Sequence, residues 1–156
     1  MVKIGLVDTT FAKVDMAKFA LQEFAKHPEV QVVRFTVPGI KDLPVACKKL
    51  LEEQACDGCL AIGMVGKAKI DVQCAHEAST GIINAQLMTN KFILGVMVFQ
   101  NEAKNPKKLL SICEDRARKH AENLVVLLTR PRELTKYAGQ GLRQGKKHEG
   151  ALKLKR

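Results

Sequence analysis

Tryptophan is absent from this 156-residue chain, and tyrosine occurs once. Long apolar runs are missing too: no stretch of about 18 apolar residues exists, which argues against a membrane-spanning helix. The first residues, MVKIGLVDTT, lack the basic, apolar and cleavage regions of a signal peptide and lead directly into a strand pattern. We therefore expect a cytoplasmic protein with no membrane partner, long enough to build one hydrophobic core.

Cysteine is present in an odd number, five, which argues against a disulfide framework. Cys56 and Cys59 form a single CxxC pair, whereas a structural zinc site needs a second pair of ligands. A redox CxxC follows a strand and begins a helix, but here a helical pattern ends and a strand pattern begins. We therefore interpret the cysteines as small buried apolar residues and predict no metal site among them.

Acidic residues are scarce relative to basic ones: 26 Lys and Arg against 16 Asp and Glu give a net charge of +10. The excess is concentrated in residues 130–156, which hold nine Lys or Arg and two Glu. We therefore divide the chain into a main α/β domain, residues 1–129, and a basic C-terminal segment, residues 130–156, that is partly helical or flexible. No basic stretch has aromatic residues between its charges for base stacking, so we expect no nucleic-acid partner.

Four short apolar runs have the composition of strands, and stretches with helical spacing lie between them and after the last. The predicted strands are residues 3–8, 30–37, 58–64 and 91–99; the predicted helices are one capped by Asp15, then residues 44–54, residues 71–88 and one that starts near Pro106. This alternation predicts an α/β three-layer sandwich whose four-stranded parallel sheet has the order 2-1-3-4. The third helix has more apolar surface than such a sheet covers, so we expect contacts between subunits.

Ligands of open parallel sheets bind beyond the carboxyl ends of the strands. The loops expected at that edge are residues 8–13, 38–42, 63–69 and 100–104. Phe11 either packs onto the first helix or presents an aromatic face to a flat ring. Gly39 and Gly66 either serve turn geometry alone or leave backbone groups open to a ligand.

Polar residues on two of the predicted helices also have two interpretations each. His76 either contacts a neighbouring subunit or does acid–base work, for which histidine suits because it titrates near neutral pH. Arg116 and His120 lie within an apolar stripe, where an arginine needs a partner. That partner is either an internal carboxylate or a hydroxyl or phosphate of a ligand.

Several stretches resemble one known family when they are taken together. They are GLVDTTFAKVDMA, TVPGIKDLPVACKKLLEE, CAHEAS with AQLMTNK, and YAGQGLRQG. In combination they resemble the archaeal-type riboflavin synthase family over nearly the whole chain, from Met1 to about Gly145. That family is similar to lumazine synthase, an α/β protein that forms pentameric rings, so the resemblance implies a lumazine synthase-like fold and a homo-oligomer, expected to be a pentamer.

The resemblance also implies a reaction. Two molecules of 6,7-dimethyl-8-ribityllumazine exchange a four-carbon unit, and the products are riboflavin and 5-amino-6-ribitylaminopyrimidinedione. The reaction needs no redox cofactor, because donor and acceptor are the same compound. For this family a divalent ion such as Mg²⁺ remains an open expectation, and the sequence shows no set of ligands for one.

The residues that match the family's site are these: Thr10, Phe11, Pro38, Gly39, Ile40, Lys41, Val65, Gly66, Lys67 and Arg116. The resemblance implies that Phe11 stacks on the lumazine ring, and that the backbone of residues 39–41 contacts the ring edge and the ribityl chain. It also implies that Arg116 binds a second lumazine, or its ribityl hydroxyls, across a subunit boundary. Lumazine synthases carry a histidine in the loop after the third strand that is missing here, while His76 stands in the segment that follows and is the catalytic candidate.

Three other functions compete with riboflavin synthase. Lumazine synthase would use the same scaffold for a different reaction. A binding or signalling module of the receiver type would need an acidic cluster after the first strand and a fifth strand, and the sequence has neither pattern. A nucleic-acid binder would depend on the basic C-terminal segment and would show a weak, strongly salt-dependent interaction.

Overall fold

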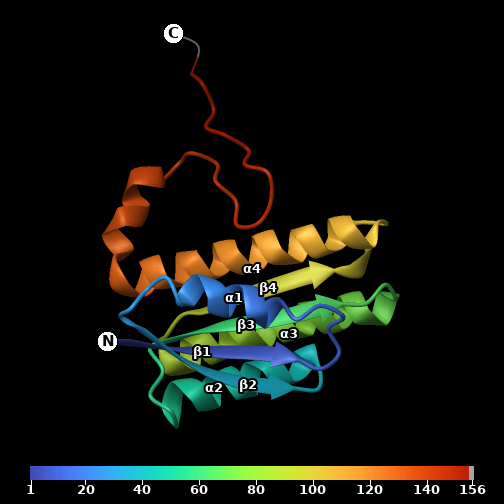
Figure 1. The fold of residues 1–156 in the computed structure, drawn as a ribbon, viewed down its shortest axis with the longest axis horizontal. Coiled ribbons are helices and arrows are strands. Elements are labelled where there is room, and N and C mark those ends of the chain that lie inside the picture. The colour runs from blue at the N-terminus through green and yellow to red at the C-terminus, as the bar shows by residue number, and fades with distance from the viewer. Residues whose placement is uncertain (155–156) are drawn as a thin grey trace.

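A computed structural model describes residues 1–154 of the chain. Four parallel strands form one sheet: β1 (Val2–Thr9), β2 (Val30–Val37), β3 (Gly58–Val65) and β4 (Ile93–Phe99). Their order is β2-β1-β3-β4, which confirms the predicted topology (Figure 1). In the register of the sheet, Val2 is opposite Val30, Ile4 is opposite Gly58, and Cys59 is opposite Ile93.

Helices cover both faces of the sheet and complete the three layers (Figure 1). Helices α1 (Met16–Phe24) and α4 (Pro106–Thr129) pack on one face. Helices α2 (Leu43–Glu52) and α3 (Lys69–Thr89) pack on the other. Short 3-10 turns precede α2 (η1, Ile40–Asp42), follow β4 (η2, Gln100–Glu102) and follow α4 (η3, Pro131–Tyr137). None of the described helices is long and apolar enough to cross a membrane.

The central strands explain why this sequence forms a covered parallel sheet. All eight residues of β3 are buried, as are the last six of β1, and both strands are nearly continuous apolar runs. Strands with apolar residues on both faces need a helical layer on each side. A side chain at Gly5 of β1 would collide with the Cys59 thiol and Leu50, so this glycine lets β3 and α2 approach closely.

The helix boundaries follow from capping side chains. The carboxylate of Asp15 accepts a hydrogen bond from the Lys18 N–H (3.3 Å) and caps α1, as predicted. Helix α3 begins at Lys69, two residues before the predicted start, because Asp71 lies at its third position and accepts from the Ala68 N–H (2.9 Å). Strand β4 begins at Ile93, two residues later than predicted.

Four of the five cysteines are buried, as the sequence predicts, and all five are free thiols. Burial raises the pKa of the Cys56 thiol to about 11. Cys74 is the exception to the prediction, since it is half-buried on α3. It lies in the second turn of that helix and packs at the margin of the core on the α2 and α3 face of the sheet.

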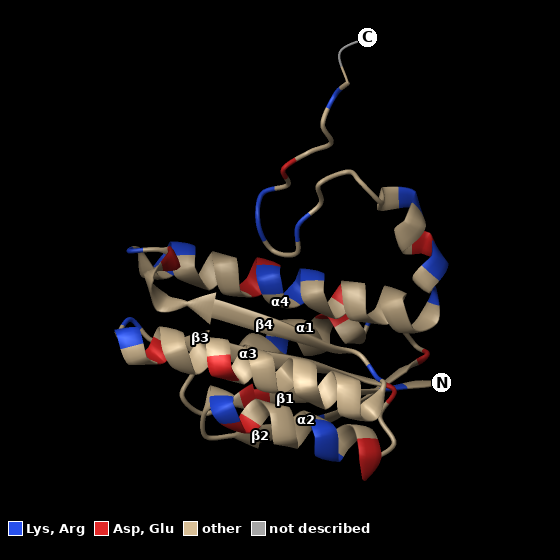
Figure 2. Ribbon diagram, turned by 180° about the vertical axis from the view of Figure 1, so that it is seen from behind, with Lys and Arg blue, Asp and Glu red and all other residues tan. Residues whose placement is uncertain are grey.

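After η3 the C-terminal segment runs back along α4 and then extends away from the sandwich (Figure 1). Lys and Arg recur along it, shown in blue in Figure 2. Helix α4 ends at Thr129, at the expected start of the basic segment, and the division into 1–129 and 130–156 stays a prediction. Residues 155 and 156 of that predicted segment lie outside the described residues.

Candidate active site

A cavity of about 370 Å³ lies at the carboxyl edge of the sheet, on the side of α2 and α3. The loops after β1 and β2, the end of β3 and the start of α3 form its walls. Seven of the eleven residues singled out in the sequence line it: Phe11, Pro38, Gly39, Ile40, Lys41, Val65 and Gly66. Asp42, Met64, Asp71 and Cys74 complete the lining. The structure therefore brings together three sequence-distant loops that the family resemblance selected.

Phe11 lies at the cavity wall with 51% of its surface exposed. A ring packed onto α1 as a core residue would be far more buried, so the exposed ring is available to a flat ligand. Thr10 does not line the cavity. Its hydroxyl donates to the Pro38 carbonyl (3.3 Å) and its N–H donates to the Val37 carbonyl (2.9 Å). Thr10 therefore fixes the Phe11 loop against the Pro38–Gly39 turn.

The turn after β2 is closed by Asp42, which sequence reasoning did not select. Its carboxylate accepts from the Gly39 N–H (3.1 Å), and its N–H donates to the Gly39 carbonyl (3.1 Å). The Gly39 amide is thus already engaged within the turn. The N–H groups of Ile40 and Lys41 donate to no acceptor in residues 1–154, so these two amides are the backbone donors that a ligand can use.

The turn after β3 is closed in the same way by Asp71. A side chain at Gly66 would collide with the Asp71 carboxylate, so only glycine lets the loop pass this close to the helix cap. Both aspartates occupy the third position of a helical turn, where a carboxylate reaches back to the N–H of the cap residue. The cap residues, Gly39 and Ala68, have no side-chain acceptor, so the sequence lacks the full capping signal, and nothing in the sequence places Cys74 at the cavity.

Lys41 is held over α3 by Glu77, at 2.9 Å between Nζ and Oε2. The hydrogen bond with Glu77 raises the pKa of Lys41, and the same contact lowers the pKa of Glu77. Both side chains are exposed, and Cys74 lies one turn before Glu77 on the same side of the helix. The ammonium of Lys41 is therefore a fixed positive charge at the mouth of the cavity.

His76 does not line this cavity. It is exposed on α3, two residues after Cys74, which corresponds to a rotation of about 200° around the helix. Its ring therefore belongs to a different side of α3 from the residues that face the cavity. If His76 acts on a ligand, that ligand lies at a neighbouring copy of the chain.

Arg116 is buried in the body of the protein, with 5% of its surface exposed. It forms two hydrogen bonds with the Glu102 carboxylate (2.7 and 2.8 Å), one with the Met97 carbonyl (2.9 Å) and longer ones with the Gly145 carbonyl (3.4 Å). Of the two partners considered from the sequence, the structure shows the internal carboxylate. His120 accompanies it, and burial lowers the pKa of its imidazole.

Lys67 also lies apart from the seven residues of the cavity. It lines a separate hollow on the other face of the sheet edge. Lys67, His76 and Arg116 were selected for binding or catalysis, and their roles toward a ligand stay predictions. Within a single chain the structure does not place them beside Phe11 and the Pro38–Gly39 turn.

Comparison with known proteins assigns the family. The family model of 6,7-dimethyl-8-ribityllumazine synthase matches residues 1–132. The chain is 52% identical to riboflavin synthase of Methanothermobacter thermautotrophicus over 97% of its length and all of that protein, and 46% identical to riboflavin synthase of Archaeoglobus fulgidus over 92% and 94%. The chain belongs to the archaeal riboflavin synthase family. Lumazine synthases are more distant: that of Pyrobaculum arsenaticum is 29% identical over 89% of this chain and 96% of its own.

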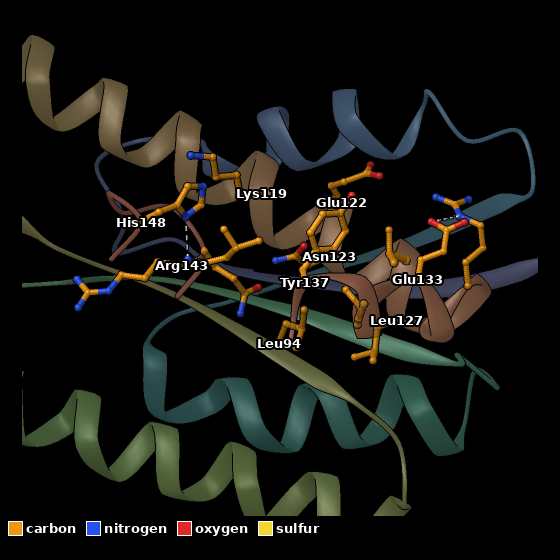
Figure 3. A pocket seen from close by; sticks show the side chains of 14 residues that line it. Leu94, Lys119, Glu122, Asn123, Leu127, Glu133, Tyr137, Arg143 and His148 are labelled. Carbon is orange, nitrogen blue, oxygen red and sulfur yellow. Dashed lines mark hydrogen bonds and ion pairs between the residues drawn. The ribbon is translucent and has the colours of Figure 1, made fainter. Parts of the chain in front are cut away.

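The 370 Å³ cavity holds seven of the residues that the resemblance selected, whereas a larger hollow of about 640 Å³ holds none of them. The larger hollow lies between α4 and the C-terminal segment. Figure 3 shows side chains from both walls around it, among them Asn123 of α4, Tyr137 of η3 and Arg143. None of the eleven residues singled out in the sequence lines it. Its walls come from α4, from Leu94 near the amino end of β4 and from the C-terminal segment, so it does not lie at the carboxyl edge of the sheet.

The structure also bears on the metal expectation for a riboflavin synthase. Within residues 1–154, no group of three or more His, Cys, Asp or Glu side chains is arranged to hold a metal ion. The residues around the cavity supply two carboxylates, Asp42 and Asp71, and each already accepts a backbone N–H. The described part of a single chain therefore offers no protein cage for Mg²⁺; the expectation of a divalent ion stays a prediction, and no step below runs through one.

Proposed function

We propose that this protein is a riboflavin synthase that converts two molecules of 6,7-dimethyl-8-ribityllumazine into riboflavin and 5-amino-6-ribitylaminopyrimidinedione. The observation that carries the proposal is the 52% identity to a riboflavin synthase over 97% of the chain. The cavity supports it with a half-exposed aromatic ring, two unused backbone N–H groups and a fixed ammonium. Those groups suit a flat heterocycle that has carbonyl oxygens at its edge and a polyol side chain.

The binding mode follows from the positions of these groups. The lumazine ring lies against Phe11, and the N–H groups of Ile40 and Lys41 donate to carbonyl oxygens at the ring edge or to ribityl hydroxyls. Val65 and Ile40 are buried and form the apolar floor. Gly66 keeps the loop low enough for the ring to enter. Because the backbone donors are already fixed in place, the protein loses little conformational freedom when the ligand binds.

The chemistry needs a proton removed from the 7-methyl group of one lumazine and a nucleophile, water or a ribityl hydroxyl, added to the other. Holding two large flat molecules in register contributes up to about 7–11 kcal/mol in well-oriented cases. A general base contributes a factor of about 10²–10⁴. Positioning by the cavity therefore outweighs any one side chain in the proposed mechanism.

His76 is the proposed base, acting on a cavity of an adjacent subunit because its ring lies away from the cavity of its own chain. We predict that His76→Ala slows turnover by about 10²-fold without abolishing it. The measurement is steady-state riboflavin formation, with Ser79→Ala, an exposed neighbour on α3, as the matched control. Complete loss of activity in a His76→Ala protein that still assembles would contradict the dominance of positioning.

We also propose that the protein is a homo-oligomer, with a pentamer as the expected form. The cavity is open on one side and holds one ring against Phe11, so a second lumazine needs a wall that an adjoining copy supplies. The exposed apolar side of α3 supports such a contact. The absence of a redox cofactor and the cytoplasmic location stay predictions of the same proposal.

The direct experiment mixes the purified protein with 6,7-dimethyl-8-ribityllumazine alone and follows the absorption spectrum. The expected result is loss of lumazine and formation of riboflavin, with one riboflavin for every two lumazines consumed. A second reaction supplies the ribitylaminopyrimidinedione and butanone phosphate, the substrates of lumazine synthase. Lumazine formation there, without riboflavin formation in the first reaction, would refute the proposed function.

A further inference from the structure

A second hollow, of about 300 Å³, lies at the carboxyl edge of the sheet on the side of α4. Three loops each contribute one lysine to it: Lys13 follows β1, Lys67 follows β3 and Lys104 follows β4. Gln100 and Pro106, the first residue of α4, line it as well. Three segments that are far apart in the sequence therefore each place an exposed lysine at the same hollow.

In the part of the chain that the structure describes, the three lysines of this lysine hollow form no ion pair, although Lys13 also borders a neighbouring hollow that Asp8 and Asp15 line. Within residues 1–154, none of its three lysines has a carboxylate within 4.0 Å, and no Asp or Glu lines it. The carboxylates nearest in the chain are already engaged. Asp8 and Asp15 both contact Arg34, at 2.6 and 3.2 Å, and Glu102 is held by Arg116 at 2.7 Å.

Gln100 points independently to a ligand. Its surface is 7% exposed, yet its side-chain amide makes no hydrogen bond with any described residue. No side-chain N or O in the described chain is both sealed from solvent and without a partner. The amide of Gln100 therefore reaches solvent through the hollow that it lines. Its two N–H donors are not used by any described residue, so they are available to a ligand that enters the hollow.

The topology places this hollow where anions bind in related architectures. In the sheet, β2 lies on one side of β1, and β3 and β4 lie on the other side. The loops after β1 and β3 therefore run in opposite directions along this edge. Open α/β sheets bind ligands at such a switch point. The start of α4 adds the positive end of a 24-residue helix. Asn105 already accepts from the N–H groups of Lys107 and Lys108, so the helix contributes its field rather than hydrogen bonds.

We propose that the lysine hollow is a binding site for a phosphate group, either orthophosphate or the terminal phosphomonoester of a small organic molecule. The three ammonium groups and the Gln100 amide supply donors for the phosphate oxygens. The volume corresponds to about ten water molecules, which is more than a single ion fills, so a phosphate carried on a short chain fits. The site lies on the other face of the sheet edge from the lumazine cavity.

The test is calorimetric titration of the full chain with sodium phosphate in a low-salt chloride buffer, without lumazine. The variants are Lys13→Gln/Lys104→Gln and, separately, Gln100→Leu. The matched control is Lys107→Gln/Lys108→Gln, which removes the same charge from exposed positions of α4 outside the hollow. Neither test variant changes a residue assigned to the lumazine cavity, so the outcome is independent of whether the protein makes riboflavin.

The expected result is saturable phosphate binding by the unmodified protein. The Kd for phosphate should rise about tenfold or more in both test variants and stay within about twofold of the parent value in the control. Phosphate resonances should broaden in ³¹P spectra with the same ranking of variants. Flavin mononucleotide and riboflavin form the second comparison. Tighter binding of the mononucleotide, competitive with phosphate, identifies a phosphomonoester ligand, and equal binding of the two identifies free phosphate.

Two outcomes overturn the proposal. One is the absence of saturable phosphate binding by the folded protein. The other is equal weakening in the control and test variants, which would show that overall charge rather than this hollow attracts the anion. Loss of riboflavin synthesis with intact phosphate binding would instead refute the proposed function and leave this site standing.

Discussion

Two phenylalanines, Phe11 and Phe35, are exposed to a similar extent but have different surroundings. Phe11 and Phe35 are 51% and 45% exposed, but Phe11 lines the candidate cavity, whereas Phe35 lies on the edge strand β2. This pair separates the effect of a ring in the site from the effect of losing a surface phenylalanine.

We predict that Phe11→Ala raises KM for the lumazine by about three- to tenfold, because an aromatic stack contributes about 0.5–1.5 kcal/mol. Phe35→Ala should leave KM unchanged. Since both rings are half-exposed, both variants should unfold at nearly the same denaturant concentration as the parent. Equal KM values for the two variants would exclude Phe11 as the stacking residue.

The Arg116–Glu102 pair leads to a prediction about pH. Burial raises the pKa of Glu102. The hydrogen bonds from Arg116 and from the Phe99 N–H together lower it by more than burial raises it, so the pKa lies below the ordinary glutamate value. Because the folded-state pKa is depressed, the ionised carboxylate stabilises the protein at pH values above the unfolded pKa of about 4.3. That stabilisation is lost as pH falls through the folded-state pKa.

Glu102→Gln should therefore lower the free energy of unfolding by about 3 kcal/mol at neutral pH, because Arg116 keeps a buried charge without its partner. The difference from the parent should shrink as pH falls below the unfolded value of about 4.3 and through the lower folded-state pKa, because the parent's Glu102 becomes protonated in that range. Urea unfolding at a series of pH values measures this. Glu114→Gln, which breaks a half-buried pair with Arg118, is the control and should change stability by less than about 1 kcal/mol, because Arg118 keeps its contact with Glu23.

The site residues show where sequence reasoning reaches its limit. The Pro38–Gly39 turn and Gly66 lie in loops whose position follows from strand order, so their convergence with Phe11 could be predicted. Strand order does not specify on which face of the sheet edge each side chain lies. Lys67 directly follows Gly66 but faces the opposite hollow. Arg116 lies on an apolar stripe, and its partner Glu102 is defined only when η2 folds beneath α4.

Among the secondary-structure elements, those with strong local signals agreed with the sequence. Strands β1 and β3 are continuous apolar runs, and α1 and α4 have Asp15 and Asn105 as caps. The boundaries that shifted moved by about two residues: α3 begins at Lys69, where Asp71 caps its first turn, and β4 begins at Ile93. Periodicity locates an element but does not report where its first hydrogen bonds form.

Asn105 gives a prediction for α4. Its side-chain oxygen accepts from the N–H groups of Lys107 (2.8 Å) and Lys108 (3.3 Å), and Pro106 has no N–H to donate. Asn105→Ala should cost about 1 kcal/mol of unfolding free energy, because two amides at the start of the helix lose their acceptor. Asn101→Ala, at an exposed position of η2, is the control, and an equal loss there would argue against a capping role for Asn105.

On the scale of the whole molecule, α3 is the element that a single chain leaves incompletely covered. Its exposed apolar residues include Ile83 and Leu87, and Leu87 is 76% exposed. Phe92, just after the helix, continues this apolar surface. A contiguous apolar surface of this kind on a folded chain is typical of a subunit interface.

We predict that Leu87→Glu shifts the protein from an oligomer toward monomers, because a buried charge without a partner opposes association. Analytical ultracentrifugation measures the distribution, and Leu110→Glu, an exposed leucine on α4, serves as the control. Riboflavin formation should fall together with the oligomer if adjoining copies complete the site. A parent protein that sediments as a monomer at all concentrations would refute the assembly.

The strand order has a consequence for synthesis on the ribosome. The sheet grows outward from its first strand, and β4 is needed to cover the outer edge of β3. Helix α4, the last part of the sandwich to be translated, supplies much of one core face. A nascent chain that ends before α4 therefore exposes the inner strands to chaperones or to aggregation, and the sandwich closes only when roughly its last fifth leaves the exit tunnel.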